Sequence, residues 1–589
     1  MRGRMGFGVL CGALALGCSE LPLSGQEPKR VLSLLHTSDI HSRVWPFRSR
    51  ISAFEAELGL GPAGAVEEQG GVARLATLLE SERRHGPSLW LDSGDALEGA
   101  EVFHRYGGRV ELSLLSSLGL GAMALGNHEL SLSGMELGEL LSETARFPVL
   151  AANLRPRVDS ALAGLVPASA LFELSGVRVG VVGVANPASP PNLASPDNPW
   201  RLEATPNLAA EVQAAVDVVS PQAALVVVLS HLGLDGDRAL VKGTTGVDLV
   251  LGGHQHVVTA QPEWEQDCAV AALQNERGCS PRRVPIVHSG AYSKWLSRLD
   301  LTLVPDLAQP GQLELSQLLL AHLPVTRKLV SDPGVSTFLE ELRLPAEPPL
   351  AFLPEPLPRA SALGGDSPLG SLTADAMLRT IEADVALLNS SGLRGDLEAG
   401  VLQHADLELA FPFDEPWRLG WLSGRALRRG LERAAWRSAT RDCVSVLQVS
   451  GLRLELHCAA CAARSEGCLE VKRRLAWGDA SLVDDELLLV GLPAYLTLAG
   501  ADFEDAAAVT TEIAGAVADT LGRYLAAQPA ASSAEVAACA DSFGQWTPSR
   551  CAEAFGAAAC PLSPERARAI CQELPAVRGG RDDRIQLLP

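Results

Sequence analysis

Leu125-Gly126-Asn127-His128-Glu129 places an amide oxygen, an imidazole and a carboxylate directly after the apolar run 122–125. Such a run is typical of a buried strand, and in layered α/β proteins the side chains that follow a buried strand enter a cleft. We therefore expect these polar residues to lie at the rim of a functional cleft, with the strands of a sheet behind them.

Four similar clusters occur in the first half of the chain, each after its own apolar run. They are Asp39-Ile40-His41 after 31–35, Gly94-Asp95 after 89–91, Ser230-His231 after 224–229, and Gly252-Gly253-His254-Gln255-His256 after 247–251. A single Asp or His after a strand is more often a turn former than a ligand. Five such clusters in order predict that several strand ends bring their side chains to one rim, which is typical of a metal site.

The candidate ligands are too numerous for one tetrahedral metal ion. They are Asp39, His41, Asp95, Asn127, His231, His254 and His256. We therefore expect two metal ions. A carboxylate that bridges two cations about 4 Å apart is the arrangement that holds both ends of an in-line phosphoryl displacement.

The length and charge of the chain limit its class. The 589 residues exceed the usual size of one domain, so two or more domains are expected. The net charge of −21 argues against a nucleic-acid groove, because phosphate polymers are bound by basic surfaces. The expected partner is a small molecule, and the sequence does not indicate an oligomeric state.

The N-terminus has the pattern of an export signal. Positive residues at 2 and 4 precede the apolar run 5–16, which is too short to span a membrane as a stable helix. Ala15-Leu16-Gly17-Cys18 resembles a bacterial lipobox, so residues 1–18 are expected to form a lipoprotein-type signal ending at a lipidated Cys18, with a polar tether at 19–30. The alternative is ordinary signal cleavage and free release. We expect a periplasmic or envelope protein with a lipid anchor in a membrane.

The cysteines support export. Without Cys11 and Cys18, ten of the twelve remain, an even number consistent with disulfides. Cys268 and Cys279 bracket a polar loop and are expected to pair. Disulfides are also favoured over a zinc knuckle for a second group, and a third group predicts a small stapled cap in the tail. The second group is Cys443, Cys458, Cys461 and Cys468, and the third is Cys539, Cys551, Cys560 and Cys571.

Strand-like runs and amphipathic helical segments alternate over residues 31–305, which predicts layered α/β packing. Frequent prolines around a helical piece at 335–342 predict a semi-rigid linker over 306–360. A second α/β unit is expected over 361–525. A helical tail with four cysteines follows at 526–589.

The five clusters resemble the motifs of the calcineurin-like metallophosphoesterases. Further motifs are similar to those of the exported 5′-nucleotidase group, which includes periplasmic UDP-sugar hydrolases and 2′,3′-cyclic nucleotide phosphodiesterases. These motifs are Leu150-Ala151-Ala152-Asn153-Leu154, Asn389-Ser390-Ser391-Gly392-Leu393-Arg394 and Phe411-Pro412-Phe413. The resemblance covers roughly residues 31–515. It implies a four-layer α/β/β/α metallophosphoesterase domain followed by a smaller α/β 5′-nucleotidase C-terminal domain.

The resemblance also implies roles for the metal ligands. One metal would be held by Asp39, His41, Asp95 and His256, and the other by Asp95, Asn127, His231 and His254. A hydroxide between the two cations would attack phosphorus, and His128 would stabilise or protonate the leaving oxygen. The mixed nitrogen and oxygen ligands suit Zn, Mn or Fe better than Mg.

The second unit would bind the substrate. The resemblance assigns Arg394 to the phosphate, for which its bidentate guanidinium is suited, and Phe413 to one face of the nucleobase. Asn389 begins the same motif as Arg394 and is a further substrate-binding candidate. Asp502 matches the residue that contacts sugar hydroxyls.

The chain departs from the family pattern at three positions. Where the family commonly has an Asp that orients the catalytic His, this chain has Ser131, whose hydroxyl can bind the ring but cannot stabilise an imidazolium by charge. An ungapped alignment places Leu363 at a phosphate-binding Arg and Leu496, beside Tyr495, at the second base-stacking aromatic. Losing one face of an aromatic sandwich removes about 1 to 3 kcal/mol of base selectivity.

The expected function is hydrolysis of nucleoside 5′-phosphates or related nucleotides by a dinuclear metal enzyme outside the cytoplasm. A second interpretation keeps the site but changes the substrate to 2′,3′-cyclic nucleotides, UDP-sugars or a non-nucleotide ester. A third is a non-catalytic surface lipoprotein that retains metals. The full set of ligands argues against the third, because a decaying site should also lose ligands.

Overall fold

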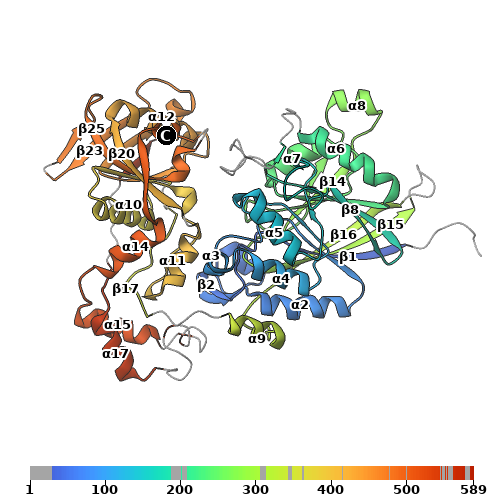
Figure 1. Ribbon diagram of the computed structural model, residues 1–589, viewed down its shortest axis with the longest axis horizontal. Helices are drawn as coiled ribbons and strands as arrows, with labels where there is room; N and C mark the ends of the chain where they lie inside the picture. The colour runs from blue at the N-terminus through green and yellow to red at the C-terminus, as the bar shows by residue number, and fades with distance from the viewer. Residues whose placement is uncertain are drawn as a thin grey trace, which may run out of the picture.

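The structure is a computed structural model that describes most of the chain. The described residues are 29–186, 200–201, 208–305, 313–342, 348–360, 364–413, 415–476, 478–498, 501–543, 546, 551, 554, 562–577 and 584–588. The expected signal with Cys18, and Leu363, lie outside them. Figure 1 shows two units, one formed by the first half of the chain and the other by the second half.

The first unit contains two six-stranded sheets packed face to face. One has the order β16-β15-β1-β4-β5-β6, with bounds Leu313–Pro324, Trp295–Pro305, Arg30–Thr37, Ser88–Asp92, Ala122–Ala124 and Val149–Leu150. The other has the order β13-β14-β12-β11-β9-β8, with bounds Glu263–Gln266, Arg283–His288, Leu249–Gly252, Leu225–Ser230, Val177–Val184 and Ser169–Leu174. Leu34, Leu91, Val181 and Val227 belong to one buried cluster between the sheets.

Helices cover both outer faces of this pair of sheets. Against the first sheet pack α2 (Val72–Arg84), α4 (Arg109–Ser117) and α5 (Gly134–Thr144), whose leucines share a core cluster with Trp90 and Met123. Against the second sheet pack α6 (Leu208–Val219) and α7 (Leu234–Lys242). The first unit therefore has the expected α/β/β/α order.

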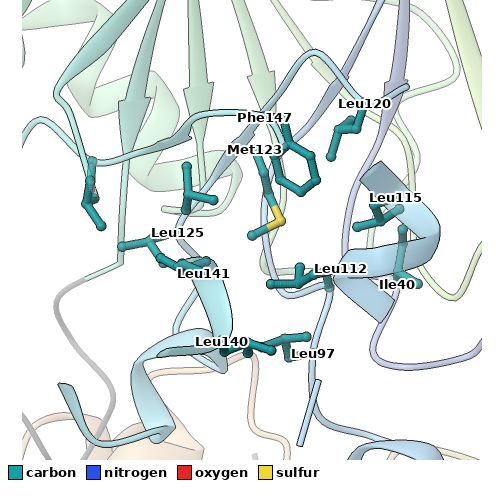
Figure 2. Packing of buried hydrophobic residues seen from close by; sticks show 14 of the residues in the cluster. Ile40, Leu97, Leu112, Leu115, Leu120, Met123, Leu125, Leu140, Leu141 and Phe147 are labelled. Carbon is teal, nitrogen blue, oxygen red and sulfur yellow. The ribbon is translucent and has the colours of Figure 1, made fainter. Parts of the chain in front are cut away.

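The core beneath the first sheet also anchors the loops that carry the candidate ligands. Ile40, Leu97 and Leu125 are at most 2 % exposed and belong to the cluster drawn in Figure 2. Ile40 lies between Asp39 and His41, while Leu97 and Leu125 are two residues from Asp95 and Asn127. Each of these three loops thus has a buried apolar side chain within two residues of a candidate ligand, so packing of the core restricts the position of the candidate ligands.

The prediction of a linker over residues 306–360 is partly wrong. Residues 313–324 form β16, which pairs antiparallel with β15 as the edge strand of the first sheet. Prolines are tolerated at an edge strand, and here Pro324 is the last residue of β16. The linker's helix is present as α9 (Pro333–Glu341), capped by the side chain of Asp332, which accepts a hydrogen bond from the Val335 amide at 2.8 Å.

The second unit is built on two smaller sheets. One has the order β21-β18-β25-β20-β26, with bounds Leu447–Ser450, Val385–Asn389, Leu487–Pro493, Pro416–Ser423 and Thr510–Ala516. The other has the order β24-β23-β22-β27, with bounds Gly478–Ser481, Leu469–Leu475, Leu452–His457 and Ile585–Leu588. The main helices are α10 (Pro368–Thr380), α11 (His404–Ala410), α12 (Gly424–Ala439) and α14 (Val517–Ala526).

The end of the chain is part of the second unit. Strand β27 pairs in parallel with β22, and the buried Arg584 guanidinium donates to both carboxylate oxygens of Asp375 on α10 at 2.8 Å. Before it, α15 (Ser533–Phe543) and α17 (Pro564–Glu573) are joined by a disulfide between Cys539 and Cys571.

The expected disulfides are present. Cys268 is bonded to Cys279, which confirms that pairing. The second group contains two disulfides, Cys443–Cys458 and Cys461–Cys468, so these thiols are not a zinc knuckle. None of the helices in the described part of the chain is long and apolar enough to span a membrane.

Candidate metal centre

Five loops at the carboxyl ends of β1, β4, β5, β11 and β12 meet at one rim. Within each sheet these strands are parallel neighbours, so their carboxyl ends lie at the same edge. Three groups have their ligand atoms within 4.8 Å of one another: Asp39, His41 and His256; His41, Asp95 and His128; and Asp95, His231 and His254. The seventh candidate, Asn127, has its Oδ1 2.9 Å from Nδ1 of His254. The structure therefore brings all seven candidate ligands together.

Asp95 connects the two outer groups, because it belongs to the group of His231 and, together with His41, to the middle group. Oδ2 of Asp95 is 2.8 Å from Nε2 of His231 and 3.8 Å from Nε2 of His41. Nε2 of His41 is 3.0 Å from Nε2 of His256, which in turn is 3.5 Å from Oδ1 of Asp39. Asp95 thus lies between the group that contains His256 and the group that contains His231.

The donor set fits divalent cations. Nδ1 of His41 lies 2.9 Å from the Glu98 carbonyl, and Nδ1 of His231 lies 2.6 Å from the Ser93 carbonyl. A carbonyl only accepts, so in the neutral form of both rings Nδ1 carries the proton and Nε2 presents a lone pair. Nε2 of His41 faces Nε2 of His256, and Nε2 of His231 faces the carboxylate of Asp95. Nitrogen and oxygen acceptors that converge without a donor between them are suited to hold a cation.

Burial makes the charges of this centre interdependent. It raises the pKa of Asp39 to about 6, although the neighbouring His231 opposes the shift. Burial alone would lower the pKa of His231, but Asp95 outweighs it and raises that pKa to about 10, because the carboxylate stabilises a positive charge at Nε2, whether a proton or a metal ion supplies it. Burial and His231 lower the pKa of His254 to about 4. The centre therefore favours positive charge close to Asp95, where the lone pairs converge.

The backbone of the loops is strained where the ligands are attached. Asp39, His41, Asp95, His254 and His256 all have positive φ, between 50° and 78°. Non-glycine residues adopt this region at a cost and persist there only when the surrounding structure holds them. Backbone strain of this kind is concentrated at functional sites, and here it falls on five of the seven candidate ligands.

Glu129 holds two of the loops together. Its buried carboxylate accepts hydrogen bonds from the backbone amides of Asp95 at 3.0 Å, Leu97 at 3.1 Å and Gly126 at 2.8 Å. Gly126 approaches Asp95 so closely that a Cβ there would lie 2.0 Å from Asp95 Oδ1. Glu129 thus fixes the backbone beneath the ligands, a role that the sequence motif did not distinguish from ligation.

His128 lies beside this centre with a carboxylate partner. Nδ1 of its ring is 2.7 Å from Oε2 of Glu98, whereas Ser131 Oγ donates to the backbone carbonyl of His128 at 2.7 Å. Burial lowers the pKa of His128, but Asp95 and then Glu98 outweigh it, so the pKa lies above its ordinary value. From the sequence, Ser131 is expected to offer this ring a hydroxyl and no charge, and in the structure the carboxylate at Nδ1 comes from Glu98, three residues after Asp95.

Two residues of the second unit reach the same place. The Phe413 ring is stacked on the His128 ring at 5.1 Å between centroids and 8° between planes. The Arg394 guanidinium carbon lies 5.3 Å from the centroid of Phe413. Burial and His41 lower the pKa of His256, and the charge of Arg394 adds to the effect. The candidate substrate residues Arg394 and Phe413 therefore face the metal centre.

Comparison with known families explains this arrangement. Residues 32–258 match the family model of calcineurin-like phosphoesterases, and residues 349–469 match that of the 5′-nucleotidase C-terminal domain. The chain belongs to the calcineurin-like phosphoesterases with a 5′-nucleotidase C-terminal domain. It is accordingly a metal-dependent phosphoric ester hydrolase.

The phosphoesterase is similar to known 5′-nucleotidases over most of its length. It is 26 % identical to a 5′-nucleotidase of Homo sapiens over 83 % of this chain and 86 % of that protein. It is also 26 % identical to a snake venom 5′-nucleotidase of Naja atra, over 72 % of this chain and 81 % of that protein. The fold matches a 5′-nucleotidase precursor from Thermus thermophilus with a TM-score of 0.72 at 23 % identity, covering 95 % of this chain and 99 % of the other.

A cavity of about 510 Å³ adjoins the metal centre of the phosphoesterase between its two units. It is lined by His256 and Tyr292 from the first unit and by Arg359 and Arg394 from the second. Arg359, which no sequence motif indicated, donates through Nη1 to the Leu393 carbonyl at 3.3 Å, next to Arg394. Arg359 therefore supplies a second positively charged side chain near Arg394. An ungapped alignment does not find it, because Arg359 lies four residues before Leu363, the position that the alignment selects.

The remaining substrate candidates are placed differently. Asn389 ends β18, and its buried Oδ1 has no hydrogen-bond partner among the described residues. Asp502 is 3 % exposed and forms an ion pair with Arg437 of α12, so its carboxylate is already engaged. Leu496 is fully buried in the core of the second unit, whereas the adjacent Tyr495 is 41 % exposed. The aromatic ring exposed at this place is therefore that of Tyr495, and the aligned position, Leu496, belongs to the core.

Proposed function

We propose that the phosphoesterase hydrolyses nucleoside 5′-monophosphates or closely related nucleotides outside the cytoplasm, using two divalent cations. The observation that carries the proposal is the approach of Arg394 and Phe413 from the second unit to the metal centre of the first. A guanidinium suits a phosphate and an aromatic ring suits a nucleobase. Arg394 and Phe413, placed beside two groups of candidate metal ligands, are therefore suited to bind a nucleotide.

One cation would be held by Asp39, His41, Asp95 and His256, and the other by Asp95, Asn127, His231 and His254. The nitrogen-rich ligand set favours Zn, Mn or Fe over Mg. When bound, the cations supply Lewis acidity at the phosphoryl group and lower the pKa of a water that serves as nucleophile. Glu98 and Ser93 accept the Nδ1 protons of His41 and His231 and so keep each Nε2 directed at the centre.

The other residues act on the substrate directly. His128 supplies a proton to the leaving oxygen, and Arg394 with Arg359 neutralises the phosphate. Arg394 and Arg359 form no ion pair with any carboxylate in the described ranges, while the other cations of the cavity, Arg50 and Lys294, are paired with Glu398 and Glu55. Two cations that have no carboxylate partner among the described residues, placed beside a metal centre, are suited to a phosphate dianion.

We expect purified enzyme supplied with Mn²⁺ or Zn²⁺ to release phosphate from AMP, GMP, UMP and CMP with less than tenfold differences in kcat/KM. The face of Phe413 that is not stacked on His128 can contact one side of any base. Leu496, buried in the core, gives no ring to the other side, so discrimination stays under about 1.4 kcal/mol. A hundredfold preference for one base would contradict this expectation and would assign the second face to Tyr495.

Replacing Arg394 by alanine is expected to raise KM for AMP by about tenfold or more, with a smaller effect on kcat, because the phosphate loses a bidentate cation in the ground state. Arg359→Ala should raise KM by less, because Arg359 is more exposed. Arg425→Ala is the matched control, since Arg425 is 61 % exposed and paired with Asp484. Steady-state kinetics on the three variants measures the effect, and an unchanged KM in Arg394→Ala would remove Arg394 from the phosphate site.

A second candidate substrate class is a nucleotide with a second esterified or anionic group, such as a UDP-sugar or a 2′,3′-cyclic nucleotide. The 510 Å³ cavity lined by Arg359 and Arg394 favours it, because it leaves room beside the metal centre. Including these compounds in the substrate panel decides between the classes. Export with a lipid anchor at Cys18 is part of the proposal, and the disulfides are consistent with an oxidising compartment.

A further inference from the structure

We propose that Glu98 is the residue that positions the His128 ring for proton transfer to the leaving group, replacing a carboxylate that Ser131 cannot supply. The inference rests on the proposed role of His128 as proton donor. Oε2 of Glu98 is 2.7 Å from Nδ1 of His128, and the two side chains are 18 % and 12 % exposed. A short contact between a carboxylate and a ring nitrogen, largely shielded from water, orients the ring strongly.

Among the described carboxylates near His128, Glu98 is the one free to take this role. Oδ1 of Asp95 already accepts from the His128 backbone amide at 2.9 Å, and Asp95 also faces the metal ligands. Glu129 is held by three backbone amides. The Glu98 carboxylate, by contrast, forms its hydrogen bond with the His128 ring.

The direction of the ring follows from this contact. Nδ1–H donates to Glu98, so Nε2 is left to exchange a proton, and Nε2 lies 3.9 Å from Oδ2 of Asp95, on the side of the metal centre. Phe413 covers one face of the ring at 5.1 Å and restricts its rotation. The ring is therefore held with one nitrogen toward Glu98 and the other toward the place where the ester bond breaks.

The backbone of Glu98 is fixed by the metal centre itself. Its carbonyl accepts from Nδ1 of His41 at 2.9 Å, and its φ of 59° lies in the left-handed region. The next residue, Gly99, packs so tightly that a Cβ there would lie 2.9 Å from the His41 Cβ. Glu98, with its strained backbone, thus orients the candidate ligand His41 through its carbonyl and His128 through its carboxylate. This fixes the position of the proton donor relative to the candidate metal ligands.

The proton balance of the step is simple. The ester P–O bond breaks with its electron pair on the leaving oxygen, and that oxygen takes the Nε2 proton of His128. Water supplies the oxygen of the new P–O bond and gives up one proton, which restores His128. Glu98 gains and loses no proton in this step, because it acts only by orienting His128. Its effect on the rate should therefore be largest for esters whose leaving oxygen must be protonated.

Glu98→Gln is therefore expected to lower kcat by about tenfold or more for phenyl phosphate, a poor leaving group, and by less than about threefold for 2,4-dinitrophenyl phosphate, a good one. KM and metal content should stay at wild-type values, because the Glu98 carbonyl that orients His41 is retained. Glu143→Gln, which removes an exposed carboxylate paired with Arg109, is the matched control and should behave as wild type. Equal losses with both esters, or loss of metal, would overturn the proposal.

Two further variants test whether a carboxylate is the operative group. Glu98→Asp should recover part of the kcat lost in Glu98→Gln, and adding Ser131→Asp to Glu98→Gln should do the same by supplying a carboxylate at the position where the family commonly has one. If neither recovers activity with phenyl phosphate, the proposal is wrong. The aryl esters contain no nucleoside, so an enzyme that hydrolyses them but not AMP would refute the proposed substrate and leave the role of Glu98 intact.

Discussion

Asp95→Asn is expected to remove most of the bound metal and to lower kcat by roughly 10³ or more, the scale of losing a principal electrostatic stabiliser. Asp95 is the carboxylate that links the group containing His41 to the group containing His231. Asparagine keeps the shape of the side chain but removes the charge, so both cations lose a shared anionic ligand. Elemental analysis of the purified variant and phosphate release with AMP measure the two effects.

The fold should survive this change, which makes the result interpretable. Glu129 still holds the backbone of the loop through the amides of Asp95 and Leu97, and Leu97 still packs in the core. Circular dichroism and thermal unfolding should therefore match the wild type measured without metal. Asp235→Asn, an exposed carboxylate paired with Arg238, controls for the loss of one charge. Two metal ions per chain in Asp95→Asn would refute the bridging role.

The grouping of the candidate metal ligands could be predicted from the sequence because these residues are tied to strand ends. In a parallel sheet, the carboxyl ends of neighbouring strands meet at one edge, so apolar runs followed by Asp, Asn or His are sufficient to group His41, Asp95 and His231. The helices over 72–84 and 208–219 were also predictable, since their apolar positions repeat with the helical period.

Other parts of the site could not be predicted, because they depend on how separate segments approach. Glu98 lies in the loop after β4 but outside the motifs read from the sequence, and its role is set by a left-handed backbone that directs its carboxylate to a ring 30 residues away. Arg359 lies outside the aligned motif and reaches Arg394 through the carbonyl of Leu393. The edge strand β16 was hidden by the prolines around it, because an edge position tolerates prolines that an interior strand would not.

His128→Ala is expected to lower kcat for AMP by roughly 10² or more while both metals are retained. The distances leave two roles open, because His128 falls within 4.8 Å of His41 and Asp95 in a group that could hold a cation. Two contacts favour proton donation: the Glu98 carboxylate at Nδ1 and the Phe413 ring on one face.

The two roles for His128 predict different combinations of measurements. A proton donor that is lost should leave elemental analysis unchanged, reduce the rate with phenyl phosphate far more than with 2,4-dinitrophenyl phosphate, and make a further Glu98→Gln change nearly silent, because Glu98 acts through the missing ring. A metal ligand that is lost should reduce metal content and both rates together, and Glu98→Gln should then add its own cost. A proportional fall of metal and rate in His128→Ala would thus reassign His128 to the metals and remove the basis for the role of Glu98 as well.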